Sequence, residues 1–276
     1  MVSEYLIYYS EMKIIFSKIM SVFALMISVG YALAEQDANT AVFVPPIQQK
    51  NSYLELAHSQ DKLSGDYQNW RSNQMNLFLS LPQKDSLSIE LNRTQRFGLQ
   101  DSSVYLNYTR PMQGGAANIE LGYTPEAEFL FKRMYGVGWN GVIGGGYGYI
   151  LAYRQRSYRD TLSDSMNLTL EKYFSDYRIA YTNTISSIDK SQTEQSHRLK
   201  LQWIGEANNR LGLTYASGNE PVYLGPSSLT AAHVSTVQMD AVWWVKDIGI
   251  SAAIWRVVQG SFYERTGAQL GLRLAF

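Results

Sequence analysis

Long stretches of this sequence alternate between apolar and polar residues with a period of two. Residues 197–203 (HRLKLQW) and 237–245 (VQMDAVWWV) are examples, and the same pattern recurs at 87–92 and 166–171. Successive side chains of a β-strand point to opposite faces, so each segment predicts a strand with one apolar and one polar face. After residue 34, no apolar run approaches the ~20 residues that a membrane helix needs. The chain is therefore predicted to be all-β.

A soluble sandwich and a membrane barrel both show this alternation, so other features must distinguish them. Several of the predicted strands exceed the ~5–6 residues that are usual in soluble sheets. Their polar faces carry amides, Thr and charges of both signs, as the interior of a membrane barrel requires. Aromatic residues gather near strand ends, where interfacial girdles lie; they are Trp139, Tyr173, Phe174, Tyr177, Trp203, Trp243 and Phe262. Together these features favour a transmembrane, antiparallel, up-and-down β-barrel.

The last residues of the chain, 268–276 (AQLGLRLAF), alternate strictly and end on Phe276. A final amphipathic strand with a terminal aromatic residue resembles the assembly signal of Gram-negative outer-membrane barrels. We therefore expect this strand to engage the barrel assembly machinery and the barrel to sit in outer-membrane lipid. Without helices, a closed barrel is the structure that can satisfy its backbone groups in lipid.

The N-terminal segment 1–34 reads as a cleaved signal peptide. Lys13 and Lys18 precede an apolar run that ends in the small-residue site Ala32–Ala34, and polar residues follow. The true start is expected at Met12, and an uncleaved anchor is the rival interpretation. Residues 35–52 are predicted to be a short periplasmic tail, and 53–276 the barrel. The expected location is the outer membrane of a Gram-negative bacterium.

Turn residues divide the barrel segment into about fourteen strands, with twelve as an alternative because 111–148 is Gly-rich and poorly periodic. The predicted strands are 53–59, 70–80, 86–96, 103–110, 117–123, 129–139, 142–157, 163–174, 176–187, 194–205, 208–218, 234–245, 248–257 and 262–276. The predicted periplasmic turns are 82–84, 111–115, 140–141, 175–176, 206–209 and 246–247, most of them tight and built of Gly, Asn, Asp or Pro. The largest connection, 219–233, is predicted to be extracellular.

Several segments resemble the YaiO family of outer-membrane β-barrel proteins. They are YLNYTRP (105–111), ELGYTPEAEFLF (120–131), YRQRSY (153–158), LEKYFSDYRIAY (170–181), YASGNEP (215–221) and YERTGAQLGLRLAF (263–276). The resemblance implies an integral outer-membrane barrel without established enzymatic activity, in a family often associated with surface or exopolysaccharide functions. Some members place the barrel behind a helical-repeat periplasmic domain. The tail 35–52 is too short for one, which weakens the inference to a polymer exporter.

Strand parity predicts a charged and polar set that faces the lumen. Its members are Glu90, Asn92, Glu120, Arg154, Glu171, Arg178, Arg198, Lys200, Asp240 and Arg273. Paired charges that neutralise a filled barrel are one interpretation; the other is the lining of a narrow pore, whose ion selectivity these charges would tune. A rival hypothesis is a closed barrel that acts as a surface interaction or structural protein through the loops 60–69 and 219–233. A surface glycan is a partner that only the family resemblance implies.

Enzymatic function is not expected. The sequence has no Cys and three His, and it has neither a G-x-S-x-G elbow nor an H-E-x-x-H motif. His197 shares the lipid-facing parity of its neighbours, His58 is predicted to end the first strand, and His233 is predicted to lie in the long loop. We therefore predict no catalytic residue, metal site or cofactor. The equal numbers of basic and acidic residues, 24 each, argue against a nucleic-acid partner.

Overall fold

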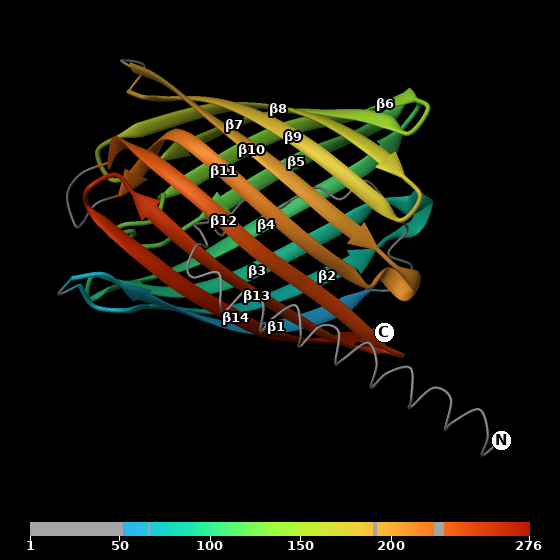
Figure 1. Cartoon of the computed structure of the whole chain (residues 1–276), viewed down its shortest axis with the longest axis horizontal. Coiled ribbons are helices and arrows are strands. Elements are labelled where there is room, and N and C mark those ends of the chain that lie inside the picture. The colour runs from blue at the N-terminus through green and yellow to red at the C-terminus, as the bar shows by residue number, and fades with distance from the viewer. Residues whose placement is uncertain (1–51, 66, 190–191, 224–228) are drawn as a thin grey trace, which may run out of the picture. The chain divides into compact units, whose positions relative to one another are not determined.

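In the computed structural model, the described residues (52–65, 67–189, 192–223 and 229–276) form fourteen strands that close into one antiparallel barrel (Figure 1). Each strand pairs with its sequence neighbours, and β1 pairs with β14. The prediction of a fourteen-strand barrel is confirmed, and the alternative of twelve strands is wrong. The predicted leader, and the predicted tail up to residue 51, lie outside the described residues.

The strands have the following bounds: β1 Tyr53–Leu63, β2 Trp70–Ser80, β3 Ser86–Arg96, β4 Leu99–Met112, β5 Gly115–Tyr123, β6 Arg133–Gly144, β7 Tyr147–Ser157, β8 Leu162–Phe174, β9 Tyr177–Ile188, β10 Gln192–Ile204, β11 Arg210–Tyr223, β12 Leu229–Val245, β13 Ile248–Gln259 and β14 Tyr263–Ala275. Most are longer than strands of soluble sheets, as the alternation predicted.

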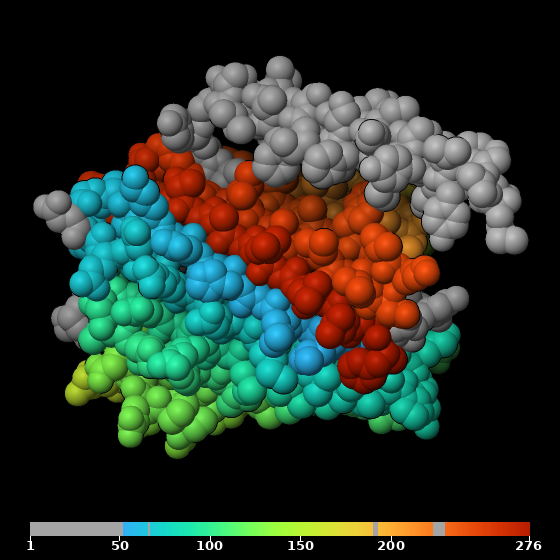
Figure 2. Space-filling model, turned by 90° about the horizontal axis from the view of Figure 1, so that it is seen from below, coloured from blue at the N-terminus to red at the C-terminus, as the bar shows by residue number. Residues whose placement is uncertain are grey.

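The first and last strands form the seam of the barrel. Tyr53 lies opposite Ala275 and Leu63 lies opposite Arg265, so the two strands pair over the whole length of β1. Figure 2 shows β1, in blue, against β14, in red, on the outer surface. Closure leaves no sheet edge, so the backbone groups of every strand are paired on both sides, as a wall in contact with lipid requires. Among the described residues, no helix has the length and apolar character to cross a membrane.

The two ends of the barrel differ in the length of their connections. One end holds Tyr53 and Ala275 and carries the turns 113–114, 145–146, 175–176 and 246–247. The other end carries the longest connection, the nine residues 124–132 between β5 and β6. Outer-membrane barrels have short periplasmic turns and longer extracellular loops. We therefore name the first end the periplasmic rim and the second the extracellular rim.

The outer wall of the barrel is apolar over the part of each strand nearer the periplasmic rim. Its exposed side chains include Leu56, Met75, Leu91, Leu121, Val137, Leu151, Leu168, Ile179, Leu201, Leu213, Ile250 and Leu272. Inward positions alternate with these and are mostly polar or charged. Because apolar side chains on an outer wall have no protein to cover them, this band is the lipid-facing surface of a membrane barrel.

Beyond the apolar band, toward the extracellular rim, the outward side chains become polar. On β1 the outward sequence changes from Leu56 to His58, and on β3 it changes from Leu91 to Arg93. The same change occurs on β10, where His197 follows Leu199 toward this rim. The wall therefore extends past the apolar band as a polar collar.

Aromatic side chains mark the periplasmic edge of the apolar band. Phe174 and Tyr177 stack with ring centroids 5.8 Å apart, and Trp203 and Trp243 stack at 6.3 Å. These four residues lie where the girdle was predicted. Tyr173 does not belong to it, because its position on β8 has the inward parity of Glu171.

The Gly-rich region was the least accurate part of the strand prediction. Asn140 and Gly141 were predicted to form a turn, since Asn-Gly is a strong hairpin signal. Instead both lie within β6, where they pair with residues of β5 and β7. The chain turns at Gly145 and Gly146, whose φ angles of 60° and 80° favour glycine. The predicted strand 142–157 accordingly begins only at Tyr147.

The predicted long loop 219–233 is also largely strand. Asn219 pairs with His233 as part of a ladder that extends β11 to Tyr223 and β12 back to Leu229. Similarly, β1 continues past residue 59 to Leu63. The strand predicted over 129–139 begins at Arg133, and residues 129–132 belong to the long connection instead.

Candidate functional site: the barrel lumen

All ten residues predicted to face the lumen occupy inward positions. Glu120, Arg154, Glu171 and Arg178 are buried, with 7%, 6%, 6% and 2% of their surface exposed. Asn92 and Lys200 are also buried, and the rest are half-buried inside the barrel; these are Glu90, Arg198, Asp240 and Arg273. Alternation alone therefore predicted the faces correctly.

Most of these charges form ion pairs across the lumen wall. Arg154 Nε donates to Glu120 Oε2 at 2.7 Å, and Arg178 Nη2 donates to Glu171 Oε2 at 2.6 Å. Lys200 Nζ lies 3.1 Å from Asp240 Oδ1. A further pair joins Arg273 to Glu55 at 2.9 Å. Opposite charges that leave bulk water are stabilised by such pairing, so these residues neutralise one another.

Two acidic partners were missed in the sequence. Glu55 lies in the first predicted strand, and extending the alternation of Tyr53 and Ala57 would have placed it inward. Asp61, which pairs with Arg265 at 3.2 Å, lies beyond the predicted end of that strand. Its inward position could be found only by recognising that β1 continues to Leu63.

Several bridges cross over an intervening strand, and an inward glycine makes each crossing possible. Glu120 on β5 reaches Arg154 on β7 above Gly136 of β6, which pairs with both residues. A Cβ at Gly136 would lie 3.0 Å from Glu120 Oε2. Similarly, Gly212 of β11, the strand between Lys200 and Asp240, lies opposite Asp240, and a Cβ there would lie 2.7 Å from Asp240 Oδ1. We refer to an inward glycine that leaves room for side chains to meet across its strand as a glycine gap.

The seam strand β14 contains two further glycine gaps. Gly267 lies between Asp61 of β1 and Trp255 of β13, and Trp255 Nε1 donates to Asp61 Oδ1 at 2.5 Å across it. Four residues further along β14, Ser251 Oγ donates to Glu55 Oε1 across Gly271. The seam is therefore joined by side chains from three strands as well as by its backbone ladder.

Two of the charged residues predicted to face the lumen, Glu90 and Arg198, form none of these ion pairs. Glu90 on β3 leaves its Oε1 buried without a hydrogen bond. Arg198 on β10 lies one inward position beyond Lys200 and forms none of the lumen ion pairs. Glu194 of β10 and Arg210 of β11, which the sequence analysis did not single out, also face the lumen, and each has a buried side-chain atom without a hydrogen bond among the described residues.

The extracellular part of the lumen is narrowed by stacked side chains. The guanidinium groups of Arg96 and Arg265 lie 4.5 and 4.6 Å from the ring of Trp70. Arg96 also lies 5.6 Å from the ring of Phe129, in the connection 124–132. Cation–π contacts of this kind are stronger where water is excluded. The four residues form a continuous stack, which we name the mouth stack.

The connection 124–132 folds against the inside of the barrel. The Asp101 carboxylate accepts hydrogen bonds from the backbone N–H groups of Glu128, Phe129 and Leu130, at 3.0, 3.0 and 2.7 Å. Phe131 is buried and packs on Tyr105 and Met134. One inward carboxylate thus fixes three consecutive backbone amides. The sequence offered no sign of this, because Phe129 and Phe131 alternate as strand residues do.

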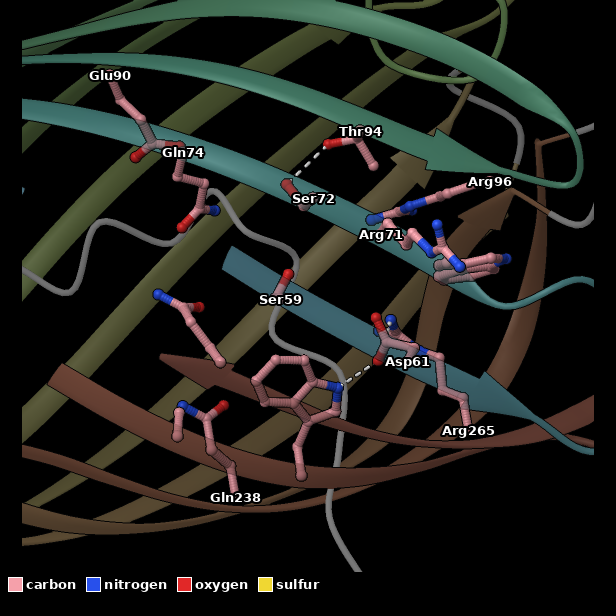
Figure 3. A pocket seen from close by; sticks show the side chains of 14 residues that line it. Ser59, Asp61, Arg71, Ser72, Gln74, Glu90, Thr94, Arg96, Gln238 and Arg265 are labelled. Atoms are coloured by element: carbon pink, nitrogen blue, oxygen red, sulfur yellow. Dashed lines mark hydrogen bonds and ion pairs between the residues drawn. The ribbon is translucent and has the colours of Figure 1, made fainter. Parts of the chain in front are cut away.

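Between the mouth stack and the middle of the barrel lies a polar cavity of about 220 Å³ (Figure 3). It is lined by Ser59, Asp61, Trp70, Arg71, Ser72, Gln74, Glu90, Thr94, Arg96, Gln238, Ala253, Trp255, Arg265 and Gln269. The lining comes from β1, β2 and β3 on one side and from β12, β13 and β14 on the other. Amides, hydroxyls and both signs of charge therefore face one water-sized space.

The histidines do not contribute to the lumen. His58 lies in the middle of β1, not at a strand end as predicted, and its Nδ1 is 2.9 Å from Asn73 Oδ1 on the outer wall. His197 faces outward as predicted, with Nδ1 2.7 Å from Tyr181 Oη. His233 lies on β12, where a loop was predicted, and also faces outward. Within the described ranges, no group of three His, Cys, Asp or Glu residues is arranged to hold a metal ion.

No family profile matches this chain, and no curated protein sequence matches it. Solved structures match it in fold. The Acinetobacter baumannii outer membrane protein Omp33 aligns at 10% identity and a TM-score of 0.48, covering 83% of this chain and 100% of that one. An anion-selective porin from Comamonas acidovorans aligns at 11% identity and 0.45, covering 82% and 98%.

A bacterial polysaccharide outer membrane secretin aligns at 7% identity and a TM-score of 0.50, covering 82% of this chain and 98% of that one. The chain is thus an outer-membrane-type β-barrel. Identities this low indicate a shared fold and nothing about function.

Proposed function

We propose that the protein is a narrow, non-enzymatic pore of the Gram-negative outer membrane that passes small polar solutes. The observation that carries this proposal is the polar cavity inside the barrel, which amides and hydroxyls line together with Glu90 and Arg96. Polar linings of this kind replace the hydration of a passing solute. The mutual neutralisation of the other lumen charges favours weak ion selectivity.

The width of this pore is set, in the proposal, by the connection 124–132 and the mouth stack. Both project from the inner wall at the extracellular rim, and Asp101 holds the connection in place. Removing the Asp101 carboxylate leaves three backbone N–H groups without their acceptor. The connection would then move away from the wall more often, and the pore would change its conductance.

Single-channel recording in a planar bilayer tests the proposal. The wild-type protein is expected to give discrete steps that scale with salt concentration, and D101A is expected to give larger or flickering steps. D164A is the matched control, because Asp164 is an outward residue of the same rim that bonds to Tyr153. Silence from both wild type and D101A, with folding verified by heat-modifiable gel mobility, would contradict the pore.

A closed barrel is the second candidate, and apolar packing at the extracellular rim favours it. Val222, Ala232, Val234 and Val257 form an inward apolar cluster, in addition to those around Trp70 and Phe131. Such a barrel would act as a structural or surface interaction protein. A role in surface-glycan export, which the YaiO resemblance implied, stays a prediction.

A further inference from the structure

Three basic side chains lie on the outer wall of neighbouring strands. Lys62 of β1, Arg71 of β2 and Arg93 of β3 are exposed and occupy outward positions. Arg71, which also borders the lumen cavity, lies between the inward residues Trp70 and Ser72 in the sequence of β2. The outer face of these strands, in blue to teal, lies beside β14 in Figure 2. We name the three residues the outer cation cluster.

The cluster lies in the polar collar, on the extracellular side of the lipid-facing band. Leu56, Met75 and Leu91 form one row of that band across the three strands, and Arg93 is the next outward residue after Leu91. From β1 to β2, and again from β2 to β3, the next cation lies two residues nearer the periplasmic rim than a straight line of paired residues would place it. Barrel strands are tilted by ~35–45°, so residues stepped in this way lie at about the same height in the membrane.

The three side chains of the cluster are close enough to bind one ligand together. Arg71 pairs with Gln60 and Gln95, which makes Lys62 and Arg93 its diagonal neighbours. Diagonal neighbours on one face of a sheet are ~7–8 Å apart, and the long side chains of Lys and Arg reach across that distance. The exposed amides of Gln60 and Gln95 lie between them as further hydrogen-bond donors.

No carboxylate on the same wall neutralises the cluster. The outward positions of β1 to β4 in the described residues contain neither Asp nor Glu. Glu264 of β14 is a diagonal neighbour of Lys62, since Lys62 pairs with Thr266, but its carboxylate is already bonded to Arg256. Uncompensated cations at the boundary between an apolar band and water match the height at which lipid phosphates lie.

We propose that the outer cation cluster binds the phosphates of a lipid headgroup, of the class of the phosphorylated glycolipid in the outer leaflet. Arg and Lys bind phosphate through charge-assisted hydrogen bonds, and Arg can bind it in a bidentate manner. The apolar band below the cluster receives the acyl chains of the same lipid. The inference depends on the barrel lying in an outer membrane, and it is independent of whether the lumen conducts.

The test is native mass spectrometry of the refolded full-length mature chain in detergent, titrated with bisphosphorylated lipid A. The variant K62Q/R71Q/R93Q is expected to bind about 100-fold more weakly than wild type, because each Lys or Arg near an anionic lipid surface contributes about fivefold. The control R110Q/K172Q/K246Q removes three exposed or half-exposed cations near the periplasmic rim and is expected to bind like wild type. Heat-modifiable mobility verifies that both variants fold.

Dephosphorylated lipid A and inorganic phosphate separate the sources of binding. The proposal expects weak binding of dephosphorylated lipid A, and little competition from millimolar inorganic phosphate. Equal binding by wild type and K62Q/R71Q/R93Q, or equal binding of the two lipid forms, would overturn it. Full displacement by inorganic phosphate would overturn the assignment to a lipid.

Discussion

The glycine gap under the Glu120–Arg154 bridge gives a direct test of how the lumen is stabilised. A Cβ at Gly136 would lie 3.0 Å from Glu120 Oε2 and 3.1 Å from Glu120 Cβ. The G136A variant must therefore displace the Glu120 side chain, which is buried and bonded to Arg154. Overpacking of this kind costs about 1–3 kcal/mol, so we expect a lower free energy of unfolding for G136A.

The sign of the effect should change when Glu120 is absent. E120A alone leaves Arg154 buried without its carboxylate and should cost about 3–5 kcal/mol. In that background the methyl group of G136A meets no Glu120 side chain, and replacing glycine in a strand gains about 0.5–1 kcal/mol. We therefore expect G136A to be neutral or stabilising in E120A, with a coupling energy of about 2 kcal/mol.

Equilibrium urea unfolding of the barrel in lipid vesicles, followed by tryptophan fluorescence, measures the four free energies. G212A is the matched control, because it crowds Asp240 in another glycine gap and should add independently to E120A. An equal penalty for G136A with and without Glu120 would refute the reasoning, since the cost would then arise from the β6 backbone itself.

Three further predictions concern the membrane band, the lumen charge and assembly. L272R places a charge in the middle of the apolar band and should destabilise the barrel by about 2–4 kcal/mol, whereas T266R in the polar collar should cost at most ~1 kcal/mol. Urea unfolding in lipid vesicles measures both costs, and equal costs would contradict the position of the band. R198Q should shift the reversal potential in a salt gradient toward cation preference, because Arg198 forms none of the lumen ion pairs; an unchanged potential would remove this residue from the solute path. Deletion of Phe276, which is 70% exposed beyond β14, should slow outer-membrane assembly, as cell fractionation would show, and normal assembly would argue against an assembly signal in this strand.

The faces of the strands could be predicted from the sequence because the side-chain period of a strand is two. Glu171 and Arg178, for example, were placed inward from their apolar neighbours alone, and both are buried. The same reasoning failed for Tyr173, since its aromatic ring suggested the girdle more strongly than its parity suggested the lumen. Composition can thus conflict with alternation, and here alternation was correct.

The ion pairs that span a glycine gap could not be predicted, because they depend on the register of strands that are not neighbours. Glu120 meets Arg154 only because Gly136 is opposite both residues. The turn at 144–146 shifts that register, and an Asn-Gly turn at 140–141 would have produced a different pairing. The inward connection 124–132 was equally hidden, since Asp101, which binds it, lies more than twenty residues earlier in the chain.

If a glycine gap serves only to admit the bridge above it, the carboxylate and the glycine should be exchangeable. In E120G/G136E the carboxylate moves to β6, directly opposite Arg154, where side chains of paired residues lie ~4.5–5.5 Å apart at Cβ. E120G alone removes the Glu120 carboxylate from Arg154, and G136E alone crowds two carboxylates around one guanidinium, so each single variant should lower the urea midpoint. The exchange variant should have a midpoint closer to wild type than either single variant. A midpoint as low as the sum of the two single effects would mean that the bridge requires its span across β6, and that the glycine gap fixes the geometry of the pair as well as making room for it.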